Sequence, residues 1–175
     1  MRLIQTIQHC DVSMFNWFMT RKHCEVSARL ARWVSRTGDG YLYLIVAAYL
    51  YHSGLPAGSL FLPIALAAFA IERSFYLVLK NGCRRYRPQD ALPNFRSFII
   101  PSDRFSFPSG HTSAAFLMAT LLGFFFPPLL WPLYAWAALV GLSRILLGVH
   151  FPTDILVGMT IGVTVAAVSL RMIAA

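Results

Sequence analysis

The chain has 175 residues, of which 57% are hydrophobic and 13% are charged, and its formal net charge is +8. This length fits one domain, and the hydrophobic content is far above that of an average soluble domain. Seven acidic residues are few for a two-metal phosphatase centre, which needs several oxygen ligands around its ions. The basic residues alternate with apolar runs of membrane length, which makes nucleic acid the least suitable partner.

The first 24 residues are amphipathic and predict a helix at the membrane interface, anchored by Phe15, Trp17 and Phe18. Polar residues interrupt this segment every few positions. We therefore expect no cleavable signal peptide, since such a peptide needs an uninterrupted apolar core.

The apolar runs that follow predict spanning helices, because Pro or Gly punctuates their ends. The run 41–51 is shorter than the ~20 residues that a spanning helix needs, so we expect the first one to begin between residues 28 and 40 and to end at His52. Four more are predicted, at residues 59–79, from the turn 109–111 to Pro127, at 129–148 and at 152–172. The predicted fold class is all-α: a polytopic membrane helical bundle of about five spanning helices plus the N-terminal interfacial helix, in a single domain of residues 1–175.

Five spans place the connection 81–110 and the turn 149–153 on the same face of the membrane. The connection contains four prolines and four phenylalanines. A loop of this length inside a compact domain is commonly functional. We interpret it as a cover over a site, partly dipped into the membrane; a passive connector is the alternative.

Three polar stretches interrupt the apolar sequence, and they lie at residues 80–88, 108–111 and 143–154. Lys80, Arg87 and Arg144 can neutralise phosphate oxygens and the charge that develops in phosphoryl transfer. An arginine within an apolar helix is costly and usually faces a polar cavity. Ser109 and Gly110 stand at the start of a predicted helix, where free N–H groups bind phosphate and glycine permits a close approach.

His150 and Asp154 are four residues apart, and Pro152 favours a helix that starts between them. Asp154 can then orient the imidazole and leave its other nitrogen free to attack, as in covalent catalysis. His111 could protonate the leaving oxygen. This spacing suggests His150 as the nucleophile without deciding between the two histidines.

Other charged residues near these stretches have less definite roles. Arg84 and Arg85 suit a solvated headgroup contact as well as a catalytic one. Glu72, Tyr76 and Lys80 share one helical face. We interpret Glu72 as a structural partner of a site cation or of a neighbouring helix.

Taken together, the three stretches resemble the tripartite signature of the type 2 phosphatidic acid phosphatase superfamily. The matching elements are Lys80-x6-Arg87-Pro88, Pro108-Ser109-Gly110-His111 and Ser143-Arg144-x5-His150-x3-Asp154. They span residues 80–154, and each motif position is present. The superfamily includes membrane lipid phosphatases, such as phosphatidylglycerophosphatase B and undecaprenyl pyrophosphate phosphatases, and soluble haloperoxidases. The apolar character of this chain disfavours the soluble branch.

The resemblance implies a metal-independent mechanism without a cofactor. It implies that His150 attacks phosphorus to form a phosphohistidine, with Asp154 orienting it. His111 would protonate the leaving group and then activate water. The phosphoryl oxygens would be held by Lys80, Arg87, Arg144, Ser109 and Gly110.

Several lipid phosphates fit this reading, and small size weakly favours undecaprenyl pyrophosphate or a polyprenyl phosphate. The alternatives are a phosphatidylglycerophosphate or phosphatidic acid phosphatase, a lipid phosphotransferase, and a lipid-binding protein without turnover. In each of these alternatives the protein's partners are membrane lipids.

The membrane orientation has two conflicting indications. The resemblance implies a bacterial inner-membrane protein with its site on the outer, periplasmic face. The positive-inside rule indicates the opposite, because nearly all Lys and Arg lie at the end of the predicted site, including Arg21, Lys22, Arg29, Arg32 and Arg36.

Overall fold

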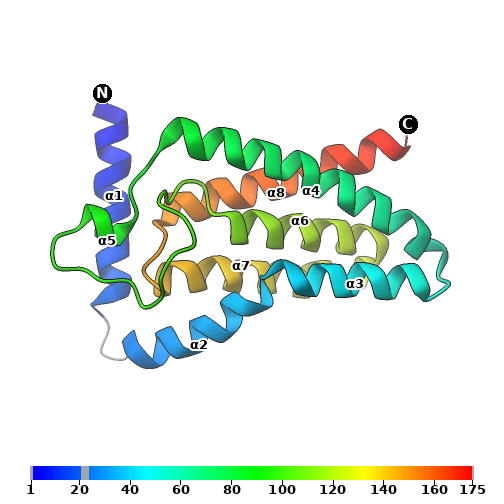
Figure 1. Cartoon of the computed structure of the whole chain (residues 1–175), viewed down its shortest axis with the longest axis horizontal. Coiled ribbons are helices and arrows are strands. Elements are labelled where there is room, and N and C mark those ends of the chain that lie inside the picture. Colours follow the sequence, from blue (N-terminus) through cyan, green and yellow to red (C-terminus); the bar gives the residue numbers. More distant parts are fainter. Residues whose placement is uncertain (1, 21–23, 175) are drawn as a thin grey trace.

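The structure, a computed structural model, describes residues 2–20 and 24–174, and most of these residues are helical. In chain order the elements are α1 (Arg2–Met19), α2 (Cys24–Thr37), α3 (Gly40–His52), α4 (Pro56–Cys83), α5 (Pro88–Ala91), α6 (Gly110–Phe125), the 3₁₀ turn η1 (Pro127–Leu129), α7 (Leu130–Leu146) and α8 (Pro152–Ala174). Helices α3, α4, α6, α7 and α8 run along the long axis of the molecule, and α1 stands across one end (Figure 1). The prediction of an all-α membrane helical bundle is confirmed.

Three helices in the described part of the chain are long and apolar enough to cross a membrane, and they cover Gly58–Cys83, Pro127–Leu146 and Pro152–Met172. Two other bundle helices are shorter: α6 has 16 residues and α3 has 13. At ~1.5 Å per residue, both fall short of a ~30 Å hydrocarbon core. The bundle thus contains the five expected helices, three of them of full membrane length.

The expected first spanning helix is divided into two. Helix α2 ends at Thr37 and α3 begins at Gly40, so Gly38 and Asp39 form a break. The indole of Trp136 on α7 donates a hydrogen bond to the Thr37 hydroxyl (2.8 Å), and the Tyr43 hydroxyl donates to the Gly38 carbonyl (3.0 Å). These bonds fix the break in place.

Helix α6 packs against α4, α7 and α8, and its closest approach is to α8. A Cβ on Gly158 would lie 2.7 Å from the Ser109 carbonyl oxygen, and one on Gly162 would lie 2.2 Å from that of Ser113. Both distances are too short for a side chain, so this small-xxx-small spacing allows the two backbones to meet. The contact brings the 108–111 motif next to the 143–154 motif.

The connection from Arg84 to Ser109 crosses the end of the bundle that α1 and α5 occupy (Figure 1). The Phe98 amide donates to the Leu147 carbonyl (3.0 Å), and the Ser106 amide donates to the Arg85 carbonyl (2.8 Å). These contacts hold the connection against the C-terminal ends of α4 and α7, close to the three motifs. That the connection covers the site stays a prediction.

Helix α1 packs against this end of the bundle rather than only against lipid. Phe15, predicted as a membrane anchor, is fully buried and meets the rings of Phe95 (5.0 Å) and Phe151 (5.5 Å) edge-on. Trp17 is exposed, in keeping with an anchor. That α1 lies at the interface stays a prediction.

Candidate active site

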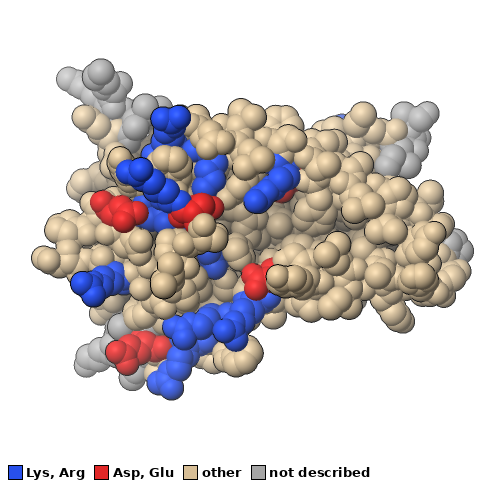
Figure 2. Space-filling model, in the orientation of Figure 1, with Lys and Arg blue, Asp and Glu red and all other residues tan. Residues whose placement is uncertain are grey.

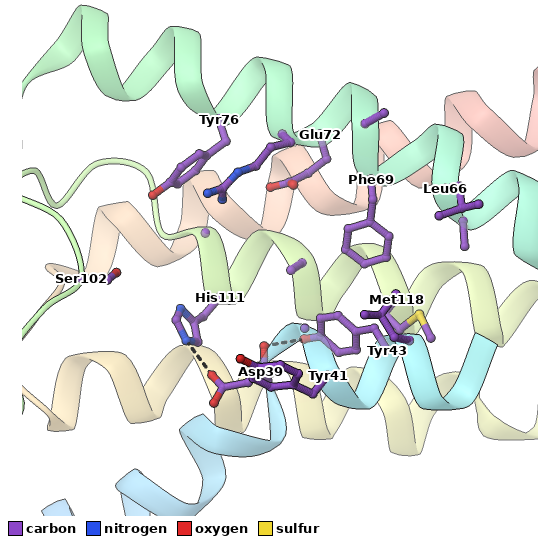
Figure 3. Close-up of a pocket in the computed structure, with 18 of the residues that line it drawn as sticks. Asp39, Tyr41, Tyr43, Leu66, Phe69, Glu72, Tyr76, Ser102, His111 and Met118 are labelled. Atoms are coloured by element: carbon purple, nitrogen blue, oxygen red, sulfur yellow. Dashed lines mark hydrogen bonds and ion pairs between the residues drawn. The ribbon is translucent and has the colours of Figure 1, made fainter. Parts of the chain in front are cut away.

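A cavity of about 970 Å³ opens between α3, α4 and α6 (Figure 3). Its lining includes most of the predicted site residues, namely Lys80, Arg87, Gly110, His111, Arg144 and His150. Ser109 and Asp154 are fully buried behind it. The three motifs therefore converge on one place, as their spacing predicts.

His150 is buried between a carboxylate and a guanidinium. Its Nδ1 lies 3.5 Å from Asp154 Oδ2, which is long for a hydrogen bond, and its Nε2 lies 3.4 Å from Arg87 Nη1. A guanidinium only donates, so this arrangement favours the tautomer with the proton on Nδ1 and a lone pair on Nε2. Nε2 is thus the nitrogen suited to attack phosphorus.

Asp154 is held by contacts of its own. It accepts from the Phe151 amide (2.8 Å) and from Arg85 Nη1 (2.9 Å). Arg85 also pairs with the buried Asp11 of α1 (2.7 Å). Arg85 therefore supports the carboxylate that faces His150, so its role is structural within the site rather than a contact with lipid headgroups.

His111 has a carboxylate partner from outside the three motifs. Its Nε2 lies 3.1 Å from Asp39 Oδ1 (Figure 3). Asp39 stands at the N-terminus of α3 but makes no capping bond with its side chain. The break between α2 and α3 thus delivers a carboxylate to the second histidine, and each histidine has an aspartate beside it.

Lys80 and Arg87 meet on one carboxylate, that of Asp103. Lys80 Nζ lies 2.9 Å and Arg87 Nη2 2.6 Å from Asp103 Oδ1, and the Tyr76 hydroxyl donates to Oδ2 (3.0 Å). Burial disfavours the charged carboxylate, but the hydrogen bonds from Lys80 and Arg87 outweigh burial and lower the pKa of Asp103 to about 2. A phosphate that binds these cations must displace Asp103 or share their donors with it.

Arg144 has a donor that no described residue accepts. It is 6% exposed, and its Nη1 donates to the Ser35 hydroxyl of α2 (2.7 Å). Its buried Nε has no hydrogen-bond partner among the described residues. A buried donor of this kind is costly, and a phosphate oxygen in the cavity would satisfy it.

The two residues at the start of α6 differ in their access to the cavity. Ser109 is the N-cap, and its hydroxyl is 2.9 Å from the Thr112 hydroxyl, so it stabilises the helix end behind the cavity. Gly110 faces the cavity, and a Cβ there would lie 2.9 Å from the Tyr76 ring. The phosphate-binding roles of both residues stay predictions.

Comparison with known families identifies the fold. The family described as PAP2 superfamily matches residues 57–175. The chain belongs to the PAP2 superfamily. The matched region contains all three motifs.

PAP2 relatives resemble the chain over most of its length. A decaprenylphosphoryl-5-phosphoribose phosphatase from Mycobacterium tuberculosis is 34% identical over 142 residues, 79% of this chain and 76% of that protein. The crystal structure of Aquifex aeolicus LpxE has a TM-score of 0.80 at 27% identity and covers 91% of this chain and 94% of that one. A PAP2-type phosphatidylglycerolphosphate phosphatase from Bacillus subtilis has a TM-score of 0.73 at 25% identity, covering 95% and 86%.

Sequence reasoning missed three carboxylates of this PAP2 site: Asp11, Asp39 and Asp103. Each lies outside the three motifs and is adjacent to the site only through the fold. One available signal was scarcity, because a membrane protein with only seven acidic residues is expected to pair each carboxylate that its fold buries.

The buried state of His150 predicts acid sensitivity. Burial lowers its pKa to about 4 despite the nearby Asp154, whereas an unfolded histidine titrates near ~6.5. The unfolded chain binds more protons between these values, so stability is full above pH ~6.5 and falls by up to about 3 kcal/mol as the pH drops to ~4. Thermal melting in detergent at pH 7 and pH 4.5 measures this loss, and His150→Gln should reduce it. An equal loss in that variant would contradict the assignment.

Proposed function

We propose that this multi-pass membrane protein is a metal-independent lipid phosphatase that works through a phosphohistidine on His150. The observation that carries the proposal is the buried Nε2 of His150, which faces Arg87 (3.4 Å) in a cavity that is cationic at one end and apolar at the other. The names of the relatives support it, since those from M. tuberculosis and B. subtilis are phosphatases of lipid-linked phosphates.

The reaction has two steps. Nε2 of His150 attacks phosphorus, the bond from phosphorus to the leaving oxygen breaks, and His111 supplies the proton to that oxygen. Water then attacks the phosphohistidine, His111 accepts a proton from it, and the P–N bond breaks to release phosphate. Lys80, Arg87 and Arg144 stabilise the equatorial oxygens in both steps.

Trapping the intermediate tests this proposal. A ³²P-labelled lipid phosphate mixed with detergent-purified protein in EDTA and quenched in alkali within milliseconds should leave a base-stable, acid-labile label on the protein, because phosphohistidine has that stability. The label should be absent from His150→Ala. An acid-stable label, or hydrolysis that stops in EDTA, would contradict the mechanism.

These observations limit the substrate to the lipid phosphates without choosing among them. Phosphatidylglycerophosphatase B of B. subtilis, which is 34% identical over 57% of this chain and 51% of that protein, favours the glycerophospholipid alternative. A phosphotransferase would use the same residues and differ in the acceptor of the phosphoryl group. Release of inorganic phosphate when water is the only acceptor present distinguishes the hydrolase.

We propose further that the protein lies in the bacterial inner membrane with the site on the outer face. Lys and Arg gather at the site end (Figure 2), which by the positive-inside rule favours the cytoplasm. However, Lys80, Arg87 and Arg144 are buried in the site, where the proposed reaction uses them, so their charge does not report on orientation. Only the exposed arginines, such as those of α2, oppose this orientation.

The orientation is testable with the exposed Cys83 at the site end of α4. A variant that keeps Cys83 as its only cysteine should react with a membrane-impermeant maleimide in intact spheroplasts. The matched control lacks the native cysteines and carries Ser53→Cys, an exposed position just before the opposite end of α4, and it should react only after lysis. The reverse pattern would place the site in the cytoplasm.

A further inference from the structure

The cavity extends beyond the phosphate-binding end along α4, and the character of its lining changes in an ordered way. Figure 3 shows Tyr76, Glu72, Phe69 and Leu66 following one another along α4, from the end near His111 toward the far end. Phe69 and Leu66 belong to the apolar part. Glu72 therefore lies between the place of the reacting phosphate and the part suited to a lipid tail.

Glu72 is 4% exposed and lines the cavity. Its nearest polar groups are Arg73 and the Ser113 hydroxyl on α6, and that hydroxyl has no hydrogen-bond partner among the described residues. Among the described residues no salt bridge forms to it, because the site cations Lys80 and Arg87 pair with Asp103 instead. Of the two partners that the sequence left open for Glu72, a site cation or a neighbouring helix, the contacts favour the helix.

A buried carboxylate in this position has unused hydrogen-bonding capacity. Two carboxylate oxygens accept about four hydrogen bonds, and Ser113 can supply one. Burial of such a group is costly unless its remaining acceptors are satisfied. A ligand with hydroxyl groups at this depth of the cavity would satisfy them.

Arg73 places a cation beside this acceptor. It is exposed at the cavity wall, and its guanidinium stacks over the Tyr76 ring at 4.6 Å from the centroid. The stacking holds the charge in place without neutralising it. An acceptor and a cation thus lie side by side, between the reacting end and the apolar part of the cavity.

We propose that Glu72 and Arg73 form a headgroup subsite that selects lipids whose phosphomonoester is carried on a hydroxyl-bearing headgroup joined to the tail by a phosphodiester. Glu72 accepts hydrogen bonds from the hydroxyls of a glycerol or sugar, and Arg73 pairs with the phosphodiester. This inference rests on the proposed function and narrows its substrate class.

The dimensions of α4 agree with this assignment. Glu72 and Lys80 are two helical turns apart, or ~12 Å along the axis, which leaves room for a headgroup between the reacting phosphate and the tail. In a polyprenyl monophosphate the apolar chain begins at the phosphate. Its methylene groups would cover Glu72 and remove water from the carboxylate without replacing the lost hydrogen bonds. The subsite therefore favours a phosphorylated polyol over the polyprenyl phosphates that small size favoured.

Competition between two substrates tests the subsite. The kcat/KM of the detergent-purified protein should be at least ~10-fold higher for phosphatidylglycerophosphate than for undecaprenyl phosphate. In Glu72→Leu this ratio should fall by ~10-fold or more, and Arg73→Gln should raise the KM for phosphatidylglycerophosphate with little change in kcat. The matched control Glu25→Leu, at an exposed carboxylate on α2, should keep the wild-type ratio.

A purely structural role for Glu72 would lower both rates by the same factor and leave the ratio unchanged, which would overturn the proposal. A wild-type preference for undecaprenyl phosphate would overturn it as well. Binding of the two lipids to His150→Ala, with and without Glu72→Leu, gives a readout that does not depend on turnover. If Glu72→Leu removes the difference in affinity between the two lipids, the subsite is supported even if the proposed chemistry is wrong. If Glu72→Leu leaves the affinity for each lipid unchanged, the subsite is rejected.

Discussion

Replacement of His150 by alanine is expected to reduce phosphate release by ~10⁴-fold or more, because it removes the atom that attacks phosphorus. The fold should persist, since Asp154 keeps its bonds to the Phe151 amide (2.8 Å) and to Arg85 (2.9 Å). Phosphate release in EDTA from a lipid phosphate measures the loss, and thermal melting in detergent verifies the fold.

The matched control is His52→Ala. His52 is exposed at the C-terminal end of α3, at the opposite end of the bundle from the site (Figure 1). This variant should retain wild-type activity, so a loss confined to His150→Ala assigns the effect to the site. Residual activity of a tenth or more in His150→Ala would mean that another group attacks phosphorus.

The helices and the convergence of the motifs were predictable because both depend on local pattern. Apolar runs bounded by Pro and Gly predict membrane helices, and the ends of α6 (Gly110–Phe125) and α8 (Pro152–Ala174) agree with the prediction. Polar groups within such runs must face a shared cavity, since lipid cannot satisfy them. Lys80, Arg144 and His150 are brought together for this reason.

The supporting carboxylates could not be predicted in the same way. Asp11, Asp39 and Asp103 lie in three segments without a motif, and each gains its role from a contact over a long sequence separation. Asp11 and Arg85 are 74 residues apart, and Asp39 and His111 are 72 apart. No periodicity encodes such pairs, because they depend on how α1 and the break before α3 pack onto the bundle.

The contacts of the apolar face of helix α1 were also not predictable from its sequence. An amphipathic pattern indicates that one face will be covered, but lipid and protein satisfy an apolar face equally well. Phe15 is covered by Phe95 and Phe151, and the buried Asp11 on the same helix marks this contact as protein rather than lipid. A charged residue on the apolar face was the available sign.

Loss of His111 should separate the two steps of the reaction. On a lipid phosphate, whose alkoxide leaves only with a proton, His111→Ala should lower kcat/KM by ~10²–10⁴-fold. An aryl phosphate such as p-nitrophenyl phosphate has a leaving group that needs no proton, so the first step should survive. Hydrolysis of the phosphohistidine would still lack its base. The variant should therefore release about one phenolate per protein molecule in a burst and then stall as the phosphoenzyme.

The same prediction applies to Asp39, which lies outside the motifs. Its Oδ1 lies 3.1 Å from His111 Nε2, so Asp39→Asn should change the same two steps in the same direction by a smaller factor, ~10-fold. Stopped-flow measurement of the burst and of the following turnover compares the two variants directly. A variant of either residue that slows aryl and lipid substrates equally, without a burst, would mean that this dyad holds the cavity in shape and transfers no proton. A burst in both variants would instead assign proton transfer in both steps to the pair of His111 and Asp39, and nucleophilic attack to His150 beside Asp154.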